Sequence, residues 1–231
     1  MWICKLQVPV SFPDPVVLEE AVTALSAVDP VIARLADRHG IPVLDRRSLR
    51  DFALEEAILQ EASEDERLFS ELVEVVVHQQ LAGRAAIAIG TRIKAALGGR
   101  TTPERVLACD PELLRATGLS QAKLTAIIGL ARAVHEGELL LGSLAGLSDE
   151  AVTLELSKLR GFGPWSAQMF LMFSLGRIDV WPAGDLGVRK GYGISYGLGK
   201  TPSPAELSLF GERFRPYRSL VAWYMWRSLS E

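Results

Sequence analysis

The sequence predicts a mainly α-helical protein with a small N-terminal appendage. Apolar residues recur at helical spacing from Arg67 almost to the C-terminus, and many of these stretches open with a proline or an N-cap residue. Strand-like alternation of apolar and polar residues occurs over residues 3–10, where Pro9 favours an edge strand. We therefore expect a helical body whose N-terminal appendage includes one short strand.

Residues 1–66 are predicted to be an N-terminal segment that forms part of the helical body. Val17–Leu25 and Pro30–Arg38 match short helices, and Asp29 is a suitable N-cap for the second. Residues 43–66 are acidic and fit either a helix or a solvated connection. Together with a core over residues 67–231, we expect one compact unit.

Within residues 67–231, helical patterns follow one another. Leu68, Leu72 and Val76 mark the apolar face of the first helix. The later predicted helices are Ala85–Leu97, Pro103–Cys109, Pro111–Thr117, Gln121–His135, Ser148–Lys158, Ser166–Leu175, Leu186–Tyr192, Pro204–Phe214 and Pro216–Leu229.

The charge is distributed unevenly along the chain. The net charge is −3, which argues against a protein that coats DNA by bulk attraction. Residues 1–80 hold 7 basic and 15 acidic side chains, whereas residues 81–231 hold 18 basic and 13 acidic ones. The second part is therefore the better candidate for nucleic-acid contacts, although chance unevenness of a solvated surface is the alternative.

Several classes of protein are disfavoured. No apolar run reaches the length of a membrane span and no secretion signal is evident, so we expect a cytoplasmic protein. Two cysteines cannot form a four-cysteine iron–sulfur cluster or a disulfide framework. The three histidines lack metal-ligand spacing.

The most informative stretch is LRGFGPWSA, residues 159–167, which lies between two helical patterns. Gly161 and Gly163 let another backbone approach closely, and Pro164 suits the first turn of a helix. The amides of a first helical turn have no intrahelical partner and carry the positive end of the helix dipole. This segment therefore predicts a binding site for an anion such as a phosphate.

A second stretch, WPAGDLG at residues 181–187, presents one carboxylate, Asp185, beside a glycine-rich turn. A carboxylate held in a fixed position can stabilise a developing positive charge and orient water. Asp185 also fits the N-cap of the following helix, and both roles can coexist.

These two motifs resemble those of the helix-hairpin-helix-Gly/Pro-Asp (HhH-GPD) superfamily of DNA glycosylases, and within it the AlkA-like 3-methyladenine DNA glycosylase II group. The resemblance extends from about Asp29 to the C-terminus and implies a fold of two helical lobes, with the hairpin in residues 155–170 and the catalytic loop in residues 180–187. Further matching motifs are DPVIA at residues 29–33, QQLAG at 79–83, GLS at 118–120 and RPYRS at 215–219.

The resemblance implies a role for each matching residue. Asp185 is the expected catalytic residue. Trp165 stands where backbone-cutting members carry a lysine, so the resemblance implies a glycosylase that uses water, because tryptophan cannot form a Schiff base. The expected pocket for a cationic alkylated base consists of Trp165, Met169, Trp226 and Trp181. Met169 departs from the tyrosine of the best-known member, which leaves the substrate range open.

The DNA contacts are likewise implied by the resemblance. Leu81 would be the wedge that fills the space of a flipped base, and Gln79 or Gln80 would touch the orphaned partner. The remaining expected DNA contacts are Gly118, Ser120, Lys123, Gly161, Gly163, Ser166 and Ala167. The backbone carbonyls of Ser157, Leu159 and Phe162 would hold a monovalent cation, Na⁺ or K⁺, when DNA is bound. No other cofactor is expected.

The resemblance thus implies a monomeric, monofunctional DNA glycosylase that acts in base excision repair on double-stranded DNA containing alkylated bases, chiefly N3-methylated purines. The alternative from another class is a non-catalytic helix-hairpin-helix DNA-binding protein, which would need neither Asp185 nor Trp165. A bifunctional glycosylase/lyase of the endonuclease III type is a third possibility, disfavoured by the missing lysine and cysteines.

Overall fold

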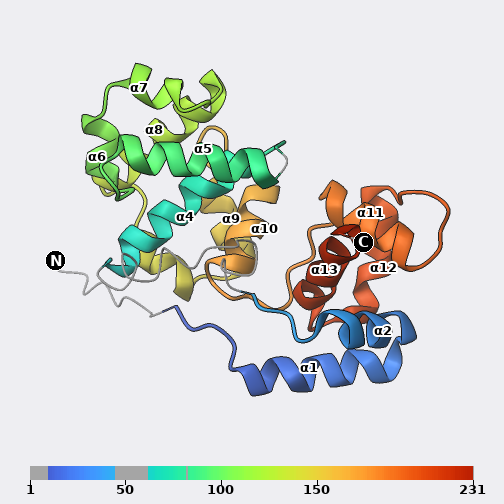
Figure 1. Cartoon of the computed structure of the whole chain (residues 1–231). Coiled ribbons are helices and arrows are strands. Elements are labelled where there is room, and N and C mark those ends of the chain that lie inside the picture. The colour runs from blue at the N-terminus through green and yellow to red at the C-terminus, as the bar shows by residue number, and fades with distance from the viewer. Residues whose placement is uncertain (1–9, 45–61, 82, 231) are drawn as a thin grey trace. The chain divides into compact units, whose positions relative to one another are not determined.

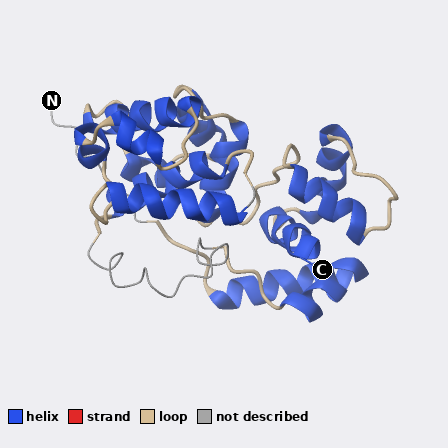
Figure 2. Cartoon of the chain, turned by 45° about the horizontal axis from the view of Figure 1, so that its top comes forward, coloured by secondary structure: helices blue, strands red, loops and turns tan. Residues whose placement is uncertain are grey.

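The computed structural model describes residues 10–44, 62–81 and 83–230. Within these ranges every regular element is a helix and none is a strand (Figure 2). The strand expected over residues 3–10 lies outside the described residues except for Val10, which is irregular. Among the helices of the described ranges, none is long and apolar enough to cross a membrane.

The helices form two compact units, each built from two stretches of chain (Figure 1). Unit one comprises residues 1–10 and 52–170, and unit two comprises residues 11–51 and 171–231. The α-helices are α1 (Pro15–Val28), α2 (Pro30–His39), α4 (Glu64–His78), α5 (Gly83–Ala96), α6 (Pro103–Ala108), α7 (Pro111–Ala116), α8 (Gln121–His135), α9 (Asp149–Ser157), α10 (Pro164–Phe173), α11 (Leu186–Ser195), α12 (Pro204–Gly211) and α13 (Arg218–Arg227). The 3-10 helices are η2 (Leu141–Gly146), η3 (Glu212–Phe214) and η4 (Ser228–Ser230).

Unit one is organised around α4. Ser63 caps this helix by accepting a hydrogen bond from Glu66 N at 3.2 Å. Three acidic residues in the first turn interact favourably with the positive end of the helix dipole. The apolar face of Leu68, Leu72 and Val76 is fully buried, and α4 packs against α5, α8 and η2. This helix therefore supplies much of the core of unit one.

In unit two, the start of α2 is tied to α11 and η3. Asp29 caps α2, as predicted, by accepting hydrogen bonds from Val31 N and Ile32 N. Its other oxygen accepts the Tyr196 hydroxyl at 2.9 Å and pairs with Arg213 at 3.0 Å. Asp29 is 5% exposed, so these partners satisfy a carboxylate that would otherwise be costly to bury.

Most predicted helices are confirmed, with shifts at their ends. The predicted helix Gln121–His135 has the bounds of α8, and Ser148 caps α9. The predicted helix Pro204–Phe214 is divided into α12 and η3. The last helix begins at Arg218 rather than Pro216, because Tyr217 has non-helical backbone angles (φ −122°, ψ 28°). The sequence patterns missed η2, a leucine- and glycine-rich turn without a side-chain cap.

Candidate active site

The loop over residues 181–187 holds Asp185 at the start of α11, in unit two. The loop is closed by hydrogen bonds from Ala183 N to Trp181 O and from Asp185 N to Pro182 O, both 2.9 Å. Asp185 Oδ1 accepts Val188 N at 2.8 Å, so the carboxylate is indeed an N-cap. The same oxygen accepts the indole N–H of Trp226 from α13 at 2.9 Å. Two donors from different helices therefore fix the direction of the carboxylate.

Gly187 leaves the space that this contact needs. A Cβ at Gly187 would lie 2.7 Å from Trp226 Cδ1, so that the indole would have to shift, and 3.0 Å from Asp185 Oδ1, which is a tight contact. The Trp226 ring also packs against Phe173, with ring centroids 5.7 Å apart. The Trp226 ring is thus held in place by its packing while its N–H points at Asp185.

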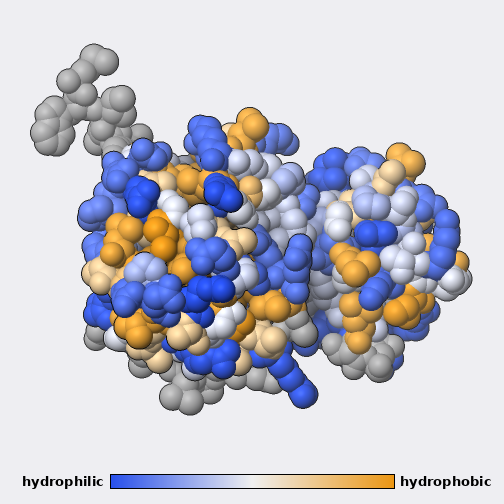
Figure 3. Space-filling view, turned by 90° about the horizontal axis from the view of Figure 1, so that it is seen from above, coloured by the Kyte–Doolittle hydropathy of each residue, from blue (hydrophilic) through white to orange (hydrophobic). Residues whose placement is uncertain are grey.

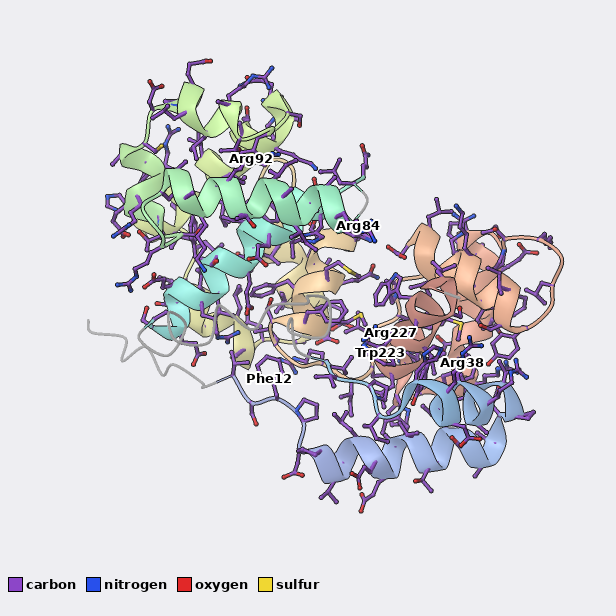
Figure 4. All side chains as sticks on the ribbon, in the orientation of Figure 1. Phe12, Arg38, Arg84, Arg92, Trp223 and Arg227 are labelled. Atoms are coloured by element: carbon purple, nitrogen blue, oxygen red, sulfur yellow. The ribbon has the colours of Figure 1, made fainter. Side chains whose placement is uncertain are left out.

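Two further tryptophans of unit two have structural contacts. Trp181 is 8% exposed, donates its indole N–H to Leu207 O at 2.8 Å and packs on Phe214. Trp223 is 4% exposed, and the guanidinium of Arg227 lies 4.8 Å from its ring centroid (Figure 4). These contacts place Trp181 and Trp223 in the core of unit two, whereas Trp226 contacts the carboxylate.

In unit one, residues 158–163 form the hairpin that joins α9 to α10. Its turn contains a hydrogen bond from Phe162 N to Leu159 O at 3.1 Å, so one expected cation-binding carbonyl already accepts a hydrogen bond. Gly161 has φ +91°, and a Cβ there would lie 2.5 Å from the Cβ of Ala126 in α8. A Cβ at Gly163 would meet no atom within 4 Å. The first glycine is therefore required by the fold, and the second leaves an open surface.

The residues that begin α10 differ in exposure. Trp165 is half-buried, Met169 is 8% exposed, and Ser166 and Ala167 are buried. Trp165 and Met169 are four residues apart, which places them on one face of α10. Of the expected cation carbonyl positions, Ser157 is the last residue of α9, and Phe162 lies in the hairpin with a buried side chain. Across the described residues, no group of His, Cys, Asp or Glu side chains is arranged to hold a metal ion.

The turn after α4, residues 79–81, lies against the hairpin. Gln79 donates its amide N–H groups to Gly161 O at 2.8 Å and Ser166 Oγ at 2.9 Å. Gln80 adopts φ +56°, and both Gln80 and Leu81 are exposed. Hydrophobic side chains are exposed elsewhere too, as Figure 3 shows on both units, and Leu113 is more exposed than Leu81. It is therefore the turn geometry, rather than hydropathy, that singles out Leu81.

The turn over residues 118–120 precedes α8. Gly118 has φ +104°, and Ser120 caps α8 by accepting Lys123 N at 3.3 Å. Arg92 of α5 donates to Thr117 O at 2.8 Å (Figure 4), which fixes the turn to α5. The ammonium of Lys123 donates to Val77 O at 2.8 Å, and burial lowers its pKa. Lys123 therefore connects α8 to the end of α4.

The structure brings Asp185 together with Trp226 in unit two, and Gln79 together with Gly161 and Ser166 in unit one. Sequence reasoning missed the contacts of Gly187 and Phe173 with Trp226. A glycine two residues after a candidate catalytic carboxylate was the available signal for the first of these. Nothing in the local pattern pointed to Phe173.

The chain is similar to a family of known proteins and to several individual relatives. A family model described as "HhH-GPD superfamily base excision DNA repair protein" matches residues 73–216. DNA-3-methyladenine glycosylase 1 of Schizosaccharomyces pombe is 36% identical over 163 residues, which cover 69% of this chain and 72% of that protein. A putative DNA-3-methyladenine glycosylase of Bacillus subtilis is 30% identical over 172 residues, 71% of this chain and 60% of that protein.

Among solved structures, the chain is similar to the S. pombe 3-methyladenine DNA glycosylase in complex with abasic DNA. The TM-score is 0.78 at 31% sequence identity, and the match covers 92% of this chain and 97% of that one. The family model spans more than half of the sequence and includes the hairpin and the Asp185 loop. The chain therefore belongs to the HhH-GPD superfamily of base excision DNA repair proteins.

Proposed function

We propose that this protein is a monofunctional DNA glycosylase that removes alkylated bases, chiefly N3-methylated purines, from double-stranded DNA. The observation that carries the proposal is the Asp185 carboxylate, held on one oxygen by Val188 N and by the Trp226 indole N–H. A DNA-binding module without catalysis has no need for a carboxylate fixed in this way. The names of the S. pombe and B. subtilis relatives support the choice of substrate class.

In the proposed reaction, the bond between the base nitrogen and C1′ breaks first. An N3-methylated purine is cationic and leaves as a neutral base, so it needs no general acid. Positive charge develops on the sugar, and Asp185 stabilises it electrostatically. Water then adds to C1′, and its proton passes to Asp185 or to solvent, which leaves an abasic site.

We assign the remaining residues by what each can contact. Trp165 presents an electron-rich ring to a cationic base, and Met169 on the same face of α10 adds apolar surface. Gly161, Gly163 and the first amides of α10 bind a phosphate, while Leu81 occupies the space of the flipped base. Because position 165 holds tryptophan rather than lysine, base release proceeds without strand cleavage. We further propose that the hairpin carbonyls bind a monovalent cation when DNA is bound and that the protein acts as a monomer.

The test is release of methylated bases from duplex DNA, separated by chromatography, with Asp185→Asn as the matched variant. The substitution keeps the size of the side chain and removes its charge, so we expect a rate loss on the order of 10²–10³ with DNA binding retained. Wild-type protein should produce alkali-labile abasic sites without nicks. If the variant released bases at the wild-type rate, this mechanism would have to be abandoned.

A further inference from the structure

Gln79 connects two parts of unit one that the proposed function uses separately. Its side-chain nitrogen donates to the Gly161 carbonyl in the hairpin, at 2.8 Å, and to the Ser166 hydroxyl in the first turn of α10, at 2.9 Å. Ser166 is 2% exposed, so one end of this bridge lies in the interior of the unit. The bridge begins two residues before Leu81 and ends at the proposed phosphate anchor.

Two other contacts connect the hairpin and the end of α4 through α8. The Cα of Gly161 packs directly on Ala126 of α8, since a Cβ there would approach Ala126 Cβ to 2.5 Å. Lys123, one turn earlier on α8, donates to Val77 O near the end of α4 at 2.8 Å. The hairpin therefore packs on α8, and α8 is bonded to the end of α4. Gln79, in the turn after α4, connects that turn to the hairpin.

The turn itself needs such support. Gln80 is a non-glycine residue at φ +56°, a left-handed conformation that is unfavourable for a residue with a Cβ and persists when the surroundings enforce it. This conformation directs Gln80 and Leu81 to the surface, where both are exposed. With the Gln79 amide bound to the hairpin, Gln80 is the glutamine of the pair that remains at the surface for an orphaned base.

We infer that Gln79 is a positioning residue that holds the Leu81 wedge at a fixed distance from the phosphate-binding hairpin. In this arrangement one phosphate contact aligns the wedge with the base step it must enter. The inference rests on the proposed function for the identity of the wedge. Beyond it, Gln79 should affect recognition of an abasic site only through Leu81.

The test is a double-mutant cycle between Gln79→Met and Leu81→Ala. Methionine keeps the length of the glutamine side chain and removes both donors. The readout is the affinity for a duplex with a tetrahydrofuran abasic site, divided by the affinity for the unmodified duplex, because only the abasic duplex offers a hole for the wedge. Arg105→Gln is the control, since Arg105 binds the Leu97 and Gly98 carbonyls at the end of α5, away from these turns.

We expect Gln79→Met to lower the affinity ratio about ten-fold in the wild-type background and less than about two-fold when Leu81 is already alanine. Arg105→Gln should leave the ratio unchanged. An equal loss in both backgrounds, or no loss in either, overturns the inference. Because this readout needs no catalysis, a wild type that recognises the abasic site but releases no base would refute the proposed function alone.

Discussion

Trp226→Phe is the sharpest test of how the carboxylate is fixed. Phenylalanine retains an aromatic ring against Phe173 and lacks the N–H that reaches Asp185 Oδ1 at 2.9 Å. A hydrogen bond to a charged group contributes about 1.5–3 kcal/mol. With tenfold in rate for each ~1.4 kcal/mol, losing this bond should slow base release by about 10- to 150-fold. The Val188 N–H remains, so the loss should stay below that of Asp185→Asn.

The assay is single-turnover base release with enzyme in excess, so that binding does not limit the rate. Gly187→Ala should also slow base release. The added Cβ would lie only 2.7 Å from Trp226 Cδ1 and would therefore displace the indole ring. Trp223→Phe is the control: this buried indole packs near Arg227 and should affect thermal stability more than rate. A Trp226→Phe rate within two-fold of wild type would show that the indole does not orient Asp185.

The remaining predictions concern DNA binding. Gly163→Val should weaken binding to abasic DNA without lowering the melting temperature, because a Cβ there meets no protein atom; unchanged affinity would remove the hairpin from the interface. Leu81→Ala should reduce excision from duplex DNA far more than from single strands, and equal loss on both would contradict a wedge. The logarithm of the binding constant should fall with the logarithm of salt concentration by about 0.9 for each phosphate bound, with a total slope of several units; a flat dependence would exclude the footprint over residues 81–231.

The helices and their caps could be predicted from the sequence because the signals are local. Asp29, Ser148 and Asp185 each precede an apolar helical pattern, and each caps the helix that follows. A residue that serves a cap must sit next to its helix, so short-range reading is sufficient.

Contacts between distant residues could not be predicted in this way. Trp226 and Asp185 are 41 residues apart, and Gln79 and Ser166 are 87 apart. The sequence offered Trp226 as a pocket residue and Gln79 as a DNA contact, and nothing in their neighbourhoods indicates the partner that each side chain meets. Such pairings depend on how the helices pack, which the pattern of a single chain leaves open.

The interleaved construction of the two units has a consequence for the order of synthesis. Helices α1 and α2 leave the ribosome early, yet their unit is completed only by residues 171–231. The Gly40 carbonyl accepts a hydrogen bond from the Tyr224 hydroxyl, and Asp29 bonds to Tyr196 and Arg213, all of which are synthesised much later. Residues 52–170 of unit one are therefore synthesised while α1 and α2 still lack these partners. The hairpin at residues 158–163 is synthesised before α13, the helix whose Trp226 donates to Asp185. Under the proposed function, the phosphate anchor is therefore made before the helix that orients the catalytic carboxylate.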